Sequence, residues 1–207
     1  MDEAGADYPA RLTIDYPDKF DRLTTFFRLV VAIPILIIAW LMTGPVYHWP
    51  WRFWAGPVIG GGYVFLPTLL MILFRKKYPR WWFDWNLALT KFGLRVSSYV
   101  LLLAQTYPST DEEQSVHLEI EYPDVEAQLG RGMPLVKWLL VIPHLVVLAF
   151  LSIVVVFCTV VAWFAILFTE KYPRSFFSLV VGVLRWSIRV DAYAVLLVTD
   201  KYPPFEL

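Results

Sequence analysis

The sequence predicts an α+β integral membrane protein built from two tandem repeats, with four transmembrane helices and a small cytoplasmic β-sheet. Three observations predict this fold class: an unusually apolar composition, two long blocks almost free of charge, and motifs that occur twice in the same order. Hydrophobic residues make up 58% and charged residues 17% of the 207 residues, against roughly 45–50% and about 25% in ordinary globular proteins. An excess of this size indicates contact with lipid.

The two blocks that are almost free of charge predict the transmembrane helices. No charged residue occurs between Lys137 and Glu170, and only Arg52 occurs between Arg28 and Arg75. Each block is longer than one membrane span of about 20 residues. We therefore expect each block to form a transmembrane hairpin of two antiparallel helices.

The boundaries of these hairpins follow from the turn residues. The first hairpin is expected at residues 25–42 and 57–74, and the second is expected to turn near Ser152. Arg28 lies one turn inside the first helix, where its long side chain is expected to reach the membrane interface.

Recurring motifs predict the repeat. Residues 11–18, RLTIDYPD, resemble residues 117–124, HLEIEYPD, and the motif Leu-Phe-x-x-Lys-Tyr-Pro-Arg occurs at 73–80 and again at 167–174. An Ile-Pro pair lies between these motifs in both halves. The predicted organisation is a first unit at 1–108 with an aromatic insertion at 43–62, a linker at 109–116, and a second unit at 117–207.

Each unit is expected to begin and end with a strand. Apolar and polar residues alternate strictly in 11–16 and in 117–122, which is typical of a half-buried strand. The apolar runs 99–104 and 193–198 are continuous, and we interpret them as the central strands of the same sheet. Two units would then supply four strands.

An amphipathic helix is predicted after each Lys-Tyr-Pro-Arg motif, from apolar residues at helical spacing. Lys91 and Arg95 lie four residues apart on one helix, and Arg185 and Arg189 do so on the other. We hypothesise that these four side chains bind lipid headgroups from helices lying in the interfacial plane. The alternative is that residues 82–104 cross the membrane, which would place two cations in hydrocarbon.

The expected topology follows from an even number of crossings in each unit. Both termini and the linker then lie on one side of the membrane, together with every basic residue except Arg52. The positive-inside rule makes that side cytoplasmic.

Residues typical of catalysis or metal binding do not form a recognisable pattern. His48, His117 and His144 have no metal-site spacing, and Cys158 is the single cysteine. Phosphate-binding, dinucleotide-binding and nucleophile-elbow motifs do not occur, and a net charge of zero does not favour nucleic acid. We therefore expect no catalytic, cofactor-binding or metal-binding residue, no cofactor, no nucleic-acid partner and no enzymatic activity.

The aromatic insertion is the most distinctive candidate surface. It gathers aromatic residues around one arginine, which is typical of an interfacial aromatic belt and also of a binding hot spot. The residues proposed for partner docking are Tyr47, Trp49, Trp51, Arg52 and Trp54.

The motifs Leu-Phe-x-x-Lys-Tyr-Pro-Arg, x-x-Arg-Val-x-x-Tyr and Tyr-Pro-Pro-Phe-Glu-Leu resemble the bacterial domain-of-unknown-function family 4389, in two tandem copies. The second unit, residues 134–207, is the more similar. The resemblance implies a membrane protein, and we expect a multi-pass protein of the bacterial inner (plasma) membrane with both termini cytoplasmic. It transfers no activity, ligand or catalytic residue.

These observations favour a non-enzymatic scaffold or accessory subunit of a membrane complex. Its expected partners are membrane lipids and other membrane protein subunits, or a second copy of itself. A lipid-binding or membrane-shaping hairpin protein is the alternative, and a transporter of a hydrophobic substrate is a weaker one.

Overall fold

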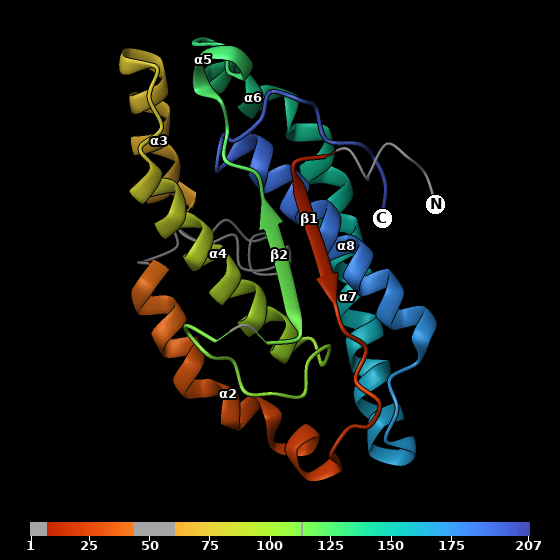
Figure 1. Ribbon diagram of the computed structural model, residues 1–207. Coiled ribbons are helices and arrows are strands. Elements are labelled where there is room, and N and C mark those ends of the chain that lie inside the picture. The colour runs from red at the N-terminus through yellow and green to blue at the C-terminus, as the bar shows by residue number, and fades with distance from the viewer. Residues whose placement is uncertain (1–7, 44–60, 113) are drawn as a thin grey trace.

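The computed structural model describes residues 8–43, 61–112 and 114–207 (Figure 1). Within these residues, two short strands are separated by helices. Along the chain the elements are β1 (Ala10–Ile14), α2 (Arg22–Thr43), α3 (Gly61–Arg75), α4 (Arg80–Val100), β2 (Val116–Ile120), the single turn α5 (Val125–Gln128), α6 (Met133–Leu140), α7 (Ile142–Thr169) and α8 (Arg174–Ala194).

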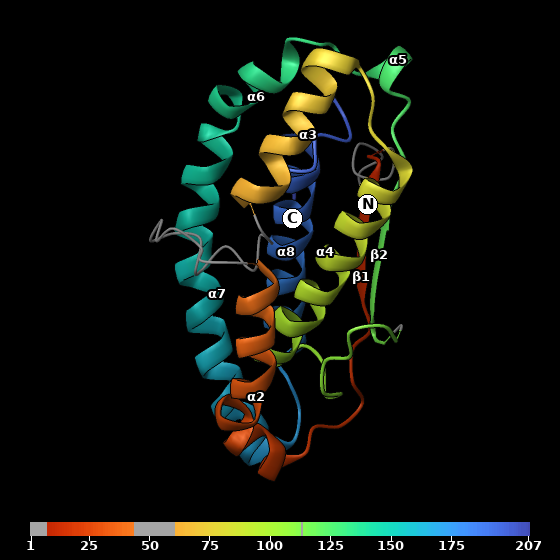
Figure 2. The same ribbon diagram turned by 90° about the vertical axis from the view of Figure 1, so that its left-hand side faces the viewer.

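The elements form three layers, which Figure 2 shows side by side. The β1–β2 ribbon forms the first layer, α4 and α8 form the middle layer, and α2, α3, α6 and α7 form the outer layer. In the middle layer, α8 packs against both β1 and α7, while α4 packs against both β2 and α2. The main core therefore lies around the two middle helices.

The ribbon is antiparallel, and its register follows from the alternation in the sequence. Leu12 lies opposite Leu118, and Ile14 lies opposite Val116. In both strands the apolar side chains are buried against the middle layer, whereas Arg11 and Glu119 on the other face are exposed. The predicted strand character of these two segments is confirmed.

The predicted fold class is wrong. Among the described residues, only α2 and α7 are long and apolar enough to cross a membrane, and the apolar stretch of α3 is shorter. Four transmembrane helices are therefore not present in the described part of the chain, and two tandem repeats are not shown.

The expected turn near Ser152 is an unbroken helix. The 28 residues of α7 run through Ser152, about 42 Å at 1.5 Å per residue. The Ser152 hydroxyl donates to the carbonyl of Ala149 in the preceding turn, so this serine is satisfied without ending the helix. Pro143 instead lies in the first turn of α7, where its missing N–H costs little, and it separates α7 from α6.

The expected central strands are also wrong, because the described sheet has two strands. Tyr99 belongs to the end of α4, and the next residues turn back so that the N–H groups of Leu103 and Ala104 donate to the carbonyl of Ser98. Residues after α8 do the same, with the N–H of Val198 donating to the carbonyl of Ala192. A short apolar run predicts burial, but it does not distinguish a strand from a helix end.

Candidate functional site

The outer layer carries a broad apolar surface. The segment of α2 from Arg22 to Met42 and the whole of α7 are the two described helices that could cross a membrane by length and composition, yet only 22% and 28% of their most apolar windows are buried. A core helix of a soluble protein would be mostly buried. The most exposed large side chains on these two helices are Leu23, Leu29, Leu41, Phe150, Ile153, Phe157 and Phe168.

The inner faces of these helices hold the molecule together. Ala32 and Ile35 of α2 pack on Phe92 and Val96 of α4. The two outer helices also contact each other, since the indole N–H of Trp163 donates to the carbonyl of Thr25 at 3.1 Å. Each outer helix therefore has one face in the protein and one face exposed.

The ribbon presents the opposite, polar surface. Arg11 pairs with Glu121 across the strands at 4.0 Å. The His117 ring lies 3.1 Å from the Asp15 carboxylate. The molecule is thus apolar on its outer layer and charged on its ribbon layer, and an exposed apolar surface of this kind marks a site of contact with a membrane or another protein.

The four residues predicted to bind lipid headgroups lie in the middle layer. Arg95 and Arg189 are 6% and 5% exposed and donate to the carbonyls of Ser109 and Glu206. The Nε of Arg185 donates to the carbonyl of Leu12 on the outward edge of β1, and Lys91 is half-buried. Headgroup binding by these residues stays a prediction, but the three arginines already donate hydrogen bonds to carbonyl groups of the protein.

The five residues predicted for partner docking, Tyr47, Trp49, Trp51, Arg52 and Trp54, lie outside the described residues.

Two buried cations were missed by sequence reasoning. Arg28 is 1% exposed, and its Nη1 donates to the carbonyls of Tyr99 and Ala104, at 2.9 and 2.7 Å. Lys137 is fully buried, and its Nζ lies 2.7 Å from both the carbonyl of Thr199 and the Asp200 carboxylate. Arg28 therefore lies at the C-terminal end of α4, where the helix dipole favours positive charge, and Lys137 lies near the ring of Tyr193 at the end of α8.

Burial and pairing act in opposite directions on Lys137. Burial lowers the pKa of its ammonium group below the ordinary value, and the hydrogen bond and charge of Asp200 oppose that shift. The signal that could have located both cations is their isolation, since each is a single positive charge within an apolar stretch.

His144 is buried and belongs to a cluster of aromatic side chains. Its Nδ1 accepts a hydrogen bond from the indole N–H of Trp186 at 3.0 Å, and its ring stacks on Phe205 at 3.9 Å between centroids. Because Nδ1 is an acceptor here, the neutral ring carries its proton on Nε2. In the described part of the chain, His, Cys, Asp and Glu form no group that could hold a metal ion.

The two Lys-Tyr-Pro-Arg turns each make the same kind of contact with the residues that follow a strand. Tyr122 donates its hydroxyl proton to the carbonyl of Tyr78, and Tyr16 does the same to Tyr172. An arginine of each motif lies over the ring of the donating tyrosine, Arg80 at 4.7 Å and Arg174 at 5.2 Å. These contacts tie the start of each middle helix to the end of a strand.

Beside the first of these turns lies an open groove of about 550 Å³. It lies between the turn that joins α3 to α4 and the segment that joins β2 to α5. Its lining residues are Lys76, Lys77, Tyr78, Pro79, Tyr122, Pro123, Asp124, Val125 and Glu126.

Comparison with known families gives one result. The model of a family described as a domain of unknown function (DUF4389) matches residues 133–206, which include α6, α7 and α8. This supports the resemblance drawn from the motifs, but one copy is matched, so the expectation of two tandem copies is not supported. Comparison with curated proteins found no match, and comparison with solved structures found none either.

Proposed function

We propose that the protein is a non-enzymatic membrane protein that serves as a scaffold or accessory subunit. Its outer layer is immersed in lipid, and its ribbon layer is in water. The observation that carries this proposal is the exposed apolar surface of α2 and α7, whose residues have no cover within the described chain. Immersion in lipid removes that surface from water at about 25 cal/mol per Å².

The order of the layers favours a position within one leaflet. The ribbon lies alongside α2 and α7, separated from them by α4 and α8 (Figure 2). If α2 and α7 crossed the bilayer, the charged ribbon and its open edges would lie at the depth of the hydrocarbon. Unpaired backbone N–H and C=O groups at a strand edge are strongly destabilised in that environment. A helix about 10 Å thick fits within one half of a hydrocarbon core of about 30 Å.

The scaffold role rests on the face that remains in water. The ribbon presents Arg11, Thr13 and Glu119 as exposed side chains on a short, supported surface. Such a surface suits a protein partner that approaches along the membrane. We place it on the cytoplasmic face of a bacterial inner membrane, because the anionic lipids of that leaflet attract exposed basic side chains such as Lys77, Arg80 and Lys171.

The orientation is tested by depth measurements on spin-labelled cysteine variants, made in a Cys158→Ser background and reconstituted in vesicles. We choose Phe150→Cys, Phe157→Cys and Phe168→Cys along the exposed face of α7, with Thr13→Cys on the ribbon as the control. The expected result is a similar shallow depth for all three α7 sites and full access to water at residue 13. A depth that rises and then falls along α7 would show a crossing helix and overturn the proposal.

A second candidate function is membrane shaping, favoured by the one-sided apolar layer. A body that enters only one leaflet expands that leaflet and prefers curved membranes. Binding to small vesicles in preference to large ones would support this role, and equal binding would leave the scaffold role in place.

A further inference from the structure

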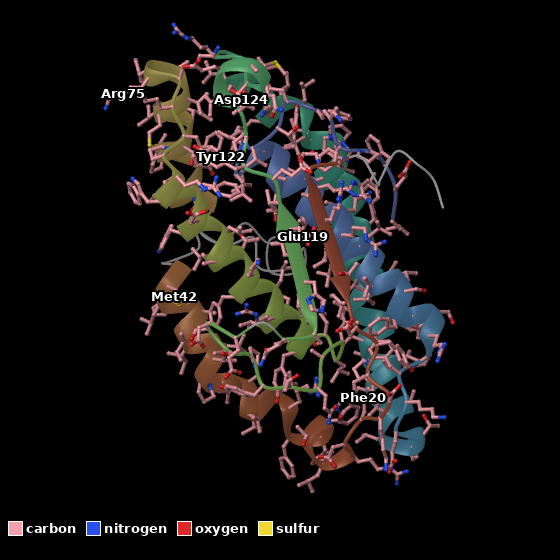
Figure 3. The ribbon with its side chains drawn as sticks, in the orientation of Figure 1. Phe20, Met42, Arg75, Glu119, Tyr122 and Asp124 are labelled. Atoms are coloured by element: carbon pink, nitrogen blue, oxygen red, sulfur yellow. The ribbon has the colours of Figure 1, made fainter. Side chains whose placement is uncertain are left out.

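The groove beside α3 and α4 has walls of opposite charge. Lys76 and Lys77 lie on one wall, and Asp124 and Glu126 lie on the other. In Figure 3, Arg75 at the end of α3 lies at the same end of the molecule as Asp124 and Tyr122. A ligand in this groove therefore meets both positive and negative charge.

Two of the four charged side chains already have a structural role. Lys76 spans the groove, since its Nζ donates to the carbonyl of Glu126 at 2.8 Å. The Asp124 carboxylate caps α5 by accepting from the N–H groups of Glu126 and Ala127. Within the described chain, the exposed side chains of Lys77 and Glu126 make no hydrogen bond or ion pair, so they can meet a ligand.

The second Lys-Tyr-Pro-Arg turn is arranged differently. There Glu170 accepts ion pairs from Lys19 at 3.0 Å and Arg22 at 3.1 Å. Phe20 is 1% exposed and donates its backbone N–H to the carbonyl of Glu170. The same motif is therefore closed by protein at one end of the molecule and left open at the other.

An apolar path leads from the outer layer to the open groove. Leu66, Leu70 and Phe74 lie four residues apart on α3 and are 55%, 43% and 74% exposed. Residues at this spacing share one face of a helix, and the face ends at the turn that carries Lys76 and Lys77. Beyond the turn, Trp81 and Trp85 are also exposed, as interfacial aromatic residues commonly are.

We propose that this groove binds the headgroup of a phospholipid that carries both a phosphate and a primary amine. The phosphate lies beside Lys76 and Lys77, the ammonium lies beside Glu126 and Asp124, and the acyl chains follow the exposed face of α3. This assignment rests on the proposed function, which immerses α3 in lipid. A purely anionic headgroup would meet the two carboxylates unfavourably, and a quaternary ammonium has no N–H to donate to them.

The test uses the full chain purified in mild detergent, with native mass spectrometry to count retained lipids. Phosphatidylethanolamine, phosphatidylcholine and phosphatidylglycerol with identical acyl chains are added separately. We expect phosphatidylethanolamine to be retained about tenfold more strongly than the other two, the effect of roughly one charge-assisted hydrogen bond. Glu126→Gln should remove most of that preference, because it removes the charge that faces the amine. Lys77→Gln should weaken the retention of all three lipids, because all three carry the phosphate that it contacts.

Lys171→Gln provides the matched control. Lys171 is exposed and occupies the same position in the second Lys-Tyr-Pro-Arg motif, so its loss should leave both the retention of the three lipids and the preference among them unchanged. Equal effects of Lys77→Gln and Lys171→Gln would overturn the proposal. Preferred retention of phosphatidylglycerol, strengthened by Glu126→Gln, would also overturn it and indicate a simple anion site.

Failure of this inference can be told apart from failure of the proposed function. If the α7 spin labels report lipid but the three phospholipids are retained equally, only the headgroup assignment fails. If the labels report water along α7, the proposed function fails first. Soluble phosphoethanolamine, added as a competitor, should displace little lipid, because it lacks the contacts along α3; complete displacement would overturn the path assigned to the acyl chains.

Discussion

Arg28 and Lys137 occupy similar places under the ends of α4 and α8, but their charges are balanced differently. Both cations lie near a tyrosine ring, with Arg28 at 4.4 Å from the Tyr99 centroid and Lys137 at 4.9 Å from that of Tyr193. Both also hold carbonyl groups that follow the helix. Lys137 has the Asp200 carboxylate as well, whereas Arg28 has no carboxylate partner among the described residues.

The difference follows from the chemistry of the two side chains. A lysine ammonium is a compact and strongly hydrated charge, so its burial calls for an ionic partner. A guanidinium spreads its charge over a plane that carbonyls and a tyrosine face can share. Both sites fix the segment that follows a middle helix. The segment after α8 is fixed by the ion pair of Lys137, and the segment after α4 is fixed by hydrogen bonds from Arg28 to carbonyl groups.

Removal of Lys137 should have the largest effect on stability. Lys137→Met leaves Asp200 without its ionic partner in a largely buried site, and the loss of one member of a buried pair typically costs about 3–5 kcal/mol. The measurement is the free energy of unfolding in detergent, from denaturant titration. The double variant Lys137→Met with Asp200→Asn should recover much of the loss, and an unrecovered loss would show that the ion pair is not the cause.

Removal of Arg28 should cost less. Arg28→Met removes hydrogen bonds to the carbonyls of Tyr99 and Ala104 but leaves no carboxylate unpaired, so we expect a loss of about 2 kcal/mol. The same titration measures it. A loss equal to that of Lys137→Met would break the comparison, because it would imply an ionic partner for Arg28.

The smallest expected effect is a gain. Gln105 lies two residues before a Tyr-Pro pair, as Asp200 does, and it is half-buried near the loop that Arg28 holds. Gln105→Asp places a carboxylate there and should raise the free energy of unfolding by about 1 kcal/mol in the presence of Arg28. In the Arg28→Met background the same substitution should give no gain, and a gain there would assign the effect to another cause.

The sequence correctly predicts the elements that are recognised by the spacing of apolar residues within one segment. Alternation located β1 and β2, and the helical spacing of apolar residues located the amphipathic helices α4 and α8. Both signals arise within one element, because they depend only on the spacing of apolar residues along it.

The wrong predictions concern contacts between distant residues. Arg28 was expected to reach the interface, but it is buried because carbonyls from the end of α4 surround it, 71 and 76 residues further along the chain. The apolar block that holds α7 was divided into a hairpin because its length exceeds one span, whereas the structure keeps it as one helix lying against α8. The isolation of Arg28 in an apolar stretch could have indicated a buried cation, but the distant carbonyls that accept its hydrogen bonds leave no local pattern.

The groove was missed for a related reason. Lys77 and Glu126 are ordinary charged residues in the sequence, and only the packing of α3 and α4 beside the end of β2 brings them to one opening. The comparable second turn is filled by Phe20, which is also unremarkable in the sequence.

The pairing of the first strand with late segments has a consequence for the order of folding. The Tyr8 hydroxyl donates to the carbonyl of Arg189, and Arg185 donates to that of Leu12, across 181 and 173 positions of the chain. Closing such long loops is slow, because the chain loses conformational entropy before the new contacts contribute favourable free energy. During synthesis, β1 must wait for β2 beside it and for α8 behind it, so the earliest strand is among the last elements to become protected from proteases and chaperones.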